Sequence, residues 1–173
     1  FIGRQYDAGR DSVRTVGAWI EHFRGVTDAV EAGRRWPLIA PNPLSGDQHL
    51  TKDGKPSFRA DACVAALRFC LAEFDAIPKG GQLSFWRGIR LPLVALIDTG
   101  GKSYHAWIRV DCRDAREWDE KVRGELYGRF FEPLGLDGAC KNPGRLSRLP
   151  GVVREGKNAF QQLVYVNPIG GTI

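Results

Sequence analysis

The sequence predicts an α+β fold, in which helices pack on a mostly antiparallel sheet. Two strand-like apolar runs joined by a glycine-rich turn indicate a β-hairpin at 91–110, and apolar residues recur at helical spacing near 13–23 and 114–130. The chain has 173 residues and 43% hydrophobic content, which is enough to bury one core without disulfides. We therefore expect a single compact domain.

Three helical segments are expected. The first covers 13–23, where apolar side chains line one helical face and Asp11 or Ser12 is available as N-cap. A short second segment covers 82–86. The third begins after Asp114, which forms a start resembling a capping box together with a glutamate three positions later. Its apolar face comprises Ala115, Trp118, Val122, Leu126 and Phe130.

The strands are expected in the second half of the chain. The nearly continuous apolar run at 63–74 fits a strand buried on both faces, with 69–74 as a central strand. Strands at 91–97 and 104–110 form the hairpin, and 163–166 is the last strand.

The segment 33–57 is rich in Pro, Gly, Asn and Asp, and is expected to be a loop that contains one hairpin around Asp53 and Gly54. A polar connection of this length in a compact domain is usually functional or mobile.

Composition restricts the class of protein. The net charge of +5 and the pI near 9.2 are compatible with a phosphate-bearing partner. The four cysteines form no CxxC pair, so we expect reduced thiols in a cytoplasmic protein and no zinc knuckle. No apolar run is long enough for a membrane span, and we expect no membrane partner. Because the chain opens at Phe1, we expect a piece of a longer protein.

Two carboxylates stand at the end of the strand expected at 69–74. Residues i and i+2 of a strand project on the same face, so Glu73 and Asp75 converge. Two anions this close raise one pKa or require a cation, and Mg²⁺ or Mn²⁺ is the usual one. The alternative is a solvated strand end at which the acids only terminate the strand.

The turn of the hairpin has the composition of a phosphate cradle. Two glycines free backbone N–H groups beside Lys102, Ser103 and His105. A Walker A loop is excluded, because Leu96 stands where that motif requires its first glycine and a strand follows in place of a helix. The alternatives are an ordinary turn lysine and a half-buried strand histidine bonded to a carbonyl.

A second basic segment follows Asp137. It carries Arg145 and Arg148, whose guanidinium groups match phosphate oxygens bidentately, so an acid and a basic cluster there suit a metal-bound triphosphate. A solvated loop with incidental charge is the alternative. Arg59, in the basic N-terminal part, is a candidate nucleic-acid contact on its charge alone.

Together and in this order, these segments resemble the archaeo-eukaryotic primase superfamily, in particular the primase-polymerases of phages, prophages and plasmids. The resemblance covers roughly 57–166. It lies in EFD at 73–75, in SYH at 103–105, and in LD at 136–137 leading to RLSRLPG at 145–151. Two departures are that Glu73 stands where many relatives have aspartate, and that no zinc-binding cysteine cluster is present.

The resemblance implies an RRM-like catalytic core and a template-dependent nucleotidyltransferase, a DNA primase or polymerase. Residues 1–173 would form its catalytic domain, with a helical and loop part at 1–56 and the core at 57–173. Glu73, Asp75 and Asp137 would be the catalytic acids and the ligands of two Mg²⁺ or Mn²⁺ ions. The residues expected to contact the nucleotide are Lys102, Ser103, His105, Arg145 and Arg148.

The implied partners are nucleoside triphosphates, a single-stranded DNA template and a helicase domain, fused or in trans. Two alternatives remain open: an inactive nucleic-acid-binding module that kept the sheet, and a metal-dependent nuclease that uses the same acids. Relaxase-type endonucleases are disfavoured because they need paired histidines, whereas His22, His49 and His105 are scattered.

Overall fold

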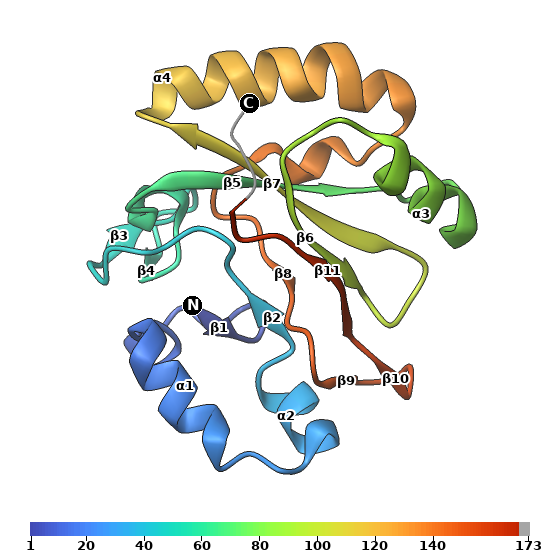
Figure 1. Ribbon diagram of the computed structural model, residues 1–173. Helices are drawn as coiled ribbons and strands as arrows, with labels where there is room; N and C mark the ends of the chain where they lie inside the picture. The colour runs from blue at the N-terminus through green and yellow to red at the C-terminus, as the bar shows by residue number, and fades with distance from the viewer. Residues whose placement is uncertain (170–173) are drawn as a thin grey trace.

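The computed structural model describes residues 1–169 and is built around one antiparallel four-stranded sheet (Figure 1). Its strands are β11 (Gln162–Val166), β6 (Leu93–Asp98), β7 (Tyr104–Cys112) and β5 (Leu67–Glu73), in that spatial order. The α+β class, the hairpin and the last strand are confirmed. The end of the expected core, 170–173, lies outside the described residues.

The sheet contains a split β-α-β unit. Strand β5 leads through helix α3 (Lys79–Gly88) to β6, and β7 returns between them, paired antiparallel with both. Cys70, Leu71 and Ala72 of β5 are buried, so this strand is covered on both faces as expected. The expected helical segment at 82–86 forms the middle of α3.

One face of the sheet is covered by α3 and by a long helix that lies across it (Figure 1). This helix begins as α4 (Ala115–Glu117) and continues as the π-helix η3 (Trp118–Phe131). The side chain of Asp114 caps it by accepting from the backbone N–H of Glu117, at 2.9 Å.

The expected apolar face of this helix was wrong at its first and last positions, because Ala115 and Phe130 are exposed. Phe131 is fully buried in place of Phe130. A π-helix has more residues per turn than an α-helix because it forms i→i+5 hydrogen bonds, so the side that faces the sheet shifts along the sequence. The buried ring of Phe131 packs edge-on against Trp86 and Tyr127.

The N-terminal part lies against the other face of the sheet (Figure 1). Strand β2 (Leu38–Ile39) pairs with β1 (Ile2–Gly3) and with β8 (Ser147–Arg148), which attaches this part to the basic segment after Asp137. Helix α2 (Ala29–Arg35) packs on β9 (Val153–Arg154) and was not expected from the sequence.

Helix α1 (Val16–Arg24) is present but begins later than expected. Its N-cap is Thr15, which accepts from the N–H of Ala18, and the segment η1 (Arg10–Ser12) forms a separate 3₁₀ turn. Asp11 and Ser12 were therefore wrong as caps.

The remaining elements are short. The hairpin expected around Asp53 and Gly54 is formed by β3 (His49–Leu50) and β4 (Pro56–Ser57). Strand β9 pairs with β10 (Ala159–Phe160), and the other elements are 3₁₀ turns. These turns are η2 (Asp61–Cys63), η4 (Glu132–Leu134) and η5 (Gly138–Lys141).

None of the described helices is long and apolar enough to cross a membrane.

Candidate active site

Glu73 and His105 form a cross-strand pair on the face of the sheet opposite the long helix. They are register partners in β5 and β7, and Nε2 of His105 lies 3.3 Å from Oε2 of Glu73. The hydroxyl of Ser103 donates to Oε1 of Glu73 at 2.5 Å. Ser103 directly precedes β7 and His105 is its second residue, so their two-residue spacing places them on the same face.

These contacts hold Glu73 as a carboxylate. Burial by itself raises its pKa, but the hydrogen bonds from His105 and Ser103 and the charge of Arg145 lower it to about 2. The side chain of Glu73 is 16% exposed, so the anion is held in a largely buried position that remains open to a ligand.

The other ring nitrogen of His105 is also bonded. Nδ1 accepts from the backbone N–H of Arg148 and lies 3.1 Å from the hydroxyl of Ser147. That hydroxyl accepts from the indole N–H of Trp107, so its hydrogen is available to Nδ1. Since Nδ1 accepts, the hydrogen of the imidazole is placed on Nε2, toward Glu73.

Asp137 is held beside Glu73 by backbone pairing. An isolated β-bridge joins Phe74 to Leu136, and the N–H of Asp137 donates to the carbonyl of Glu73 at 2.8 Å. Its side chain caps η5 by accepting from the N–H of Ala139, and the other oxygen lies 3.5 Å from Arg145. The two motifs are thus joined through main chain, independently of any bound ion.

Glu73, Asp137 and Cys140 place one ligand atom each within 4.8 Å of one another. The two carboxylates suit a hard divalent ion such as Mg²⁺ or Mn²⁺. The thiol of Cys140 does not, because burial raises its pKa to about 12 and keeps it protonated, and sulfur is a soft ligand. The donor set therefore fits one hard ion held by Glu73 and Asp137.

Asp75 lies just beyond β5 and is not part of this group. Its side chain is 53% exposed and forms an ion pair with Lys102 at 3.1 Å. Two residues that the sequence assigned to different tasks, metal binding and phosphate binding, are thus in contact with each other.

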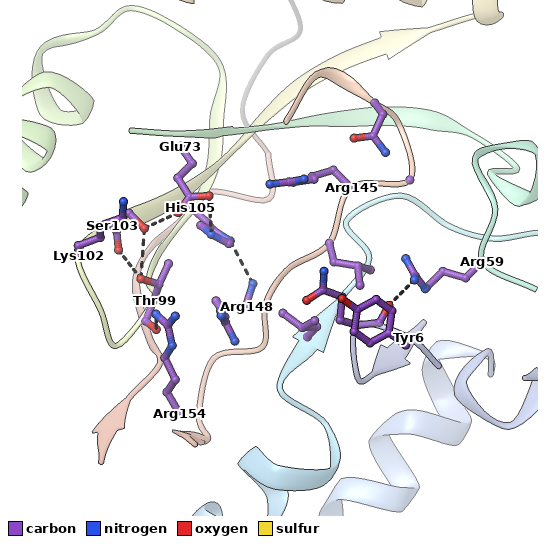
Figure 2. A pocket seen from close by; sticks show the side chains of 15 residues that line it. Tyr6, Arg59, Glu73, Thr99, Lys102, Ser103, His105, Arg145, Arg148 and Arg154 are labelled. Carbon is purple, nitrogen blue, oxygen red and sulfur yellow. Dashed lines mark hydrogen bonds and ion pairs between the residues drawn. The ribbon is translucent and has the colours of Figure 1, made fainter. Parts of the chain in front are cut away.

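A cavity of about 390 Å³ opens beside the Glu73–His105 pair (Figure 2). Among the described residues, its lining includes five cationic side chains and one carboxylate, that of Glu73. The cationic side chains belong to Arg59, Lys102, Arg145, Arg148 and Arg154. All five residues expected to contact a nucleotide line this cavity, as does Arg59. Such an excess of positive charge suits a polyanionic ligand such as a triphosphate.

Arg154 was missed by the sequence analysis. Its guanidinium donates to the carbonyl of Thr99 at 3.4 Å. The Nη1 atom of Arg154 lies only 2.3 Å from the position that a Cβ on Gly101 would take. The glycine-rich turn therefore matters for its open space as well as for its N–H groups. The sequence offers one hint of Arg154, which follows Arg148 at six residues, twice the interval between Arg145 and Arg148.

Two polar side chains, the buried Gln82 and the half-buried Asp61, fix the loops around the cavity. Gln82 on α3 donates to the carbonyl of Lys102 and accepts from the N–H of Tyr104, so it holds the residues on both sides of Ser103. Asp61 accepts from the side chain of Asn142 and from the N–H of Gly144, three residues before the strand that carries Arg148. These contacts preorganise both basic segments without occupying the cavity.

The chain is similar to a solved structure, the archaeo-eukaryotic primase (AEP) domain of the cyanophage S-2L primase-polymerase (PrimPol). The two share 24% sequence identity, and they superpose with a TM-score of 0.54 over 66% of this chain and 60% of that one. This chain has the AEP fold. The resemblance found in the sequence is thereby confirmed at the level of the fold. No family model matches the chain, and a search of curated proteins gave no significant match.

The AEP fold accounts for the arrangement of the site. The sheet presents the first acid and the Ser-x-His pair side by side, and the segment after the long helix returns to add Asp137. The matched region is 60% of the cyanophage domain, so the activity of a whole primase-polymerase is a proposal for this chain.

Proposed function

We propose that residues 1–173 form the catalytic domain of a metal-dependent nucleotidyltransferase, a DNA primase or polymerase that joins nucleotides on a template. The observation that carries this proposal is the placement of two carboxylates, Glu73 and Asp137, next to a cavity with five cationic side chains. The AEP fold supports it. Within this domain, residues 1–56 would form the N-terminal helical and loop part, and residues 57–173 would form the catalytic core.

Glu73 and Asp137 would hold one Mg²⁺ or Mn²⁺ ion, and Asp75 would complete a site for two ions together with phosphate oxygens of the substrate. When bound, such ions activate a 3′-hydroxyl and neutralise charge on the triphosphate and the leaving pyrophosphate. The hydrogen bonds from His105 and Ser103 orient the carboxylate of Glu73 for this task.

The triphosphate would lie along the cationic lining of the cavity. Lys102 and Ser103 approach it from the turn before β7, and His105 approaches it from β7 itself. Arg145, Arg148 and Arg154 approach from the basic segment and from β9. Fixed cations opposite a phosphate chain stabilise the charge that builds on it during transfer. Ion pairing with Lys102 and Arg145 holds the side chains of Asp75 and Asp137 in place before a substrate arrives.

The template would be single-stranded DNA, with Arg59 as a contact, and a helicase domain would act with this chain, fused or in trans. The positive net charge favours such a polyanionic partner.

Primer extension on a single-stranded DNA template tests this function. Labelled primer is incubated with Mg²⁺ or Mn²⁺ and with ribo- or deoxynucleoside triphosphates in separate reactions. We expect elongation by the natural chain and none by Glu73→Gln or Asp75→Asn, because each change removes one carboxylate and preserves the shape. The matched control is Asp119→Asn, an exposed carboxylate on η3 that should leave elongation unchanged.

Three results would contradict the proposal in different ways. Elongation by Asp75→Asn at the natural rate would remove Asp75 from the metal site. Shortening of the primer with or without nucleotides would indicate a nuclease, and DNA binding without incorporation would indicate an inactive binding module.

A further inference from the structure

Tyr6 is presented to the nucleotide cavity by a tight turn. The N–H of Asp7 donates to the carbonyl of Arg4, and the side chain of Asp7 accepts from the N–H of Arg4 at 2.7 Å, which closes the turn from both sides. Gln5 and Tyr6 occupy its centre and line the cavity. Tyr6 is 87% exposed, so packing does not account for an aromatic residue at this position.

Arg59 holds the main chain on both sides of Tyr6. Its Nη2 donates to the carbonyl of Gln5 at 2.5 Å, and its Nε donates to the carbonyl of Asp7 at 3.3 Å. The guanidinium also lies over the ring of Phe1, 5.2 Å from its centroid. One side chain from a segment about 50 residues away in sequence therefore fixes the turn at the cavity.

The cavity has two chemically different ends. Lys102, Ser103 and Arg154 lie on one side in Figure 2, and Tyr6 and Arg59 lie on the other, with Arg148 between them. Leu38 and Leu146 also line the cavity. A nucleoside triphosphate also has two chemically different ends, with an anionic phosphate chain at one end and a flat base at the other.

We infer that Tyr6 stacks on the base of the incoming nucleotide and that Arg59 is the positioning residue for its turn. The inference rests on the proposed function and adds to it a base-binding residue outside the segments that resemble the family. Stacking accepts every base, because each has a flat π-face. An enzyme that takes its sequence from a template requires such tolerance.

Equilibrium binding with two probes tests the inference without relying on catalysis. One probe is dATP, and the other is inorganic tripolyphosphate, which has the phosphates and no base; both are titrated by calorimetry with excess Mg²⁺. We expect Tyr6→Ala to weaken dATP binding about ten-fold or more and to leave tripolyphosphate binding unchanged. Tyr6→Phe should restore dATP binding, because it retains the ring.

Two further variants serve as controls. Arg154→Ala should weaken both probes, because its guanidinium lies among the phosphate-binding groups, and Tyr165→Ala, an exposed aromatic on β11, should weaken neither. If Arg59 acts on the base through Tyr6, the double variant Tyr6→Ala/Arg59→Ala should have the same ratio of dATP affinity to tripolyphosphate affinity as Tyr6→Ala alone, because the loss of a cationic side chain affects both probes.

Unchanged dATP binding by Tyr6→Ala, or an equal loss of both probes, would overturn the inference and leave the proposed function standing. A lower ratio of dATP affinity to tripolyphosphate affinity in the double variant than in Tyr6→Ala would overturn the role given to Arg59. If the natural chain bound neither probe, the proposed function would fail, and the inference with it.

Discussion

The backbone N–H of Arg148 donates to Nδ1 of His105 at 3.1 Å, which joins the basic segment to the sheet through a single imidazole. His105 thereby connects two groups that lie more than 70 residues apart in the sequence, the main chain of Arg148 and the carboxylate of Glu73. Removing the ring would therefore break its contact with the main chain of Arg148 and its contact with Glu73.

His105→Ala should raise the apparent KM for the nucleotide by about ten-fold, the effect of losing one hydrogen bond to a charged group. Mn²⁺ binding should largely persist, since Glu73 keeps its bond from Ser103. Steady-state kinetics and Mn²⁺ titration measure the two effects separately. Natural KM values in the variant would leave His105 with a purely structural role.

Asp137→Ala should abolish incorporation, whereas Asp111→Ala should remain active. Asp137 lies beside Glu73, but Asp111 is exposed near the opposite end of β7, where Cys112 pairs with Leu67. Primer extension with each variant at equal concentration checks this. A loss of activity in Asp111→Ala with natural stability would show that the third acid has been wrongly chosen.

Stability should fall as the pH drops from about 5 toward 2, in part because of Glu73. Its folded pKa is about 2, below the ordinary value of 4.5, so its stabilising contribution is present above pH 4.5 and is lost as the pH approaches 2. The contribution is on the order of 3 kcal/mol at most.

Urea denaturation of metal-free protein between pH 6 and 2.5 measures this effect, as the difference between the natural chain and Glu73→Gln. The comparison is needed because the pKa of Glu117 is also lowered to about 2, through hydrogen bonds from Arg113 and Lys121, and gives the same trend. Parallel stability curves for the two proteins would contradict the role of Glu73.

Alanine at the two glycines of the hairpin turn should have different effects. Gly101→Ala should displace the flexible guanidinium of Arg154, raising the nucleotide KM several-fold with a change in unfolding free energy below about 1 kcal/mol. Gly100→Ala should cost about 1–2 kcal/mol, because Gly100 has φ +64° and its Cβ would lie 2.9 Å from the carbonyl oxygen of Ala159.

Urea denaturation and steady-state kinetics on the same two variants make the comparison. Natural kinetics in Gly101→Ala would indicate that Arg154 does not contact the nucleotide, and natural stability in Gly100→Ala would contradict the backbone argument.

The sequence by itself determined the local parts of this protein. Alternation and apolar runs predicted β5, the β6–β7 hairpin and β11, because side-chain direction in a strand depends only on position along it. The same periodicity put Ser103 and His105 on one face. The capping role of Asp114 was also predictable, since the bond it makes spans three residues.

Only the tertiary structure decided which distant groups meet. Asp137 reaches Glu73 through a β-bridge across more than 60 residues, and Arg154 and Tyr6 enter the cavity from opposite ends of the chain. The π-helix likewise turned Phe131 inward in place of Phe130. Such encounters depend on strand register and on how whole elements pack, which are properties of the assembled core that neighbouring residues in the sequence do not encode.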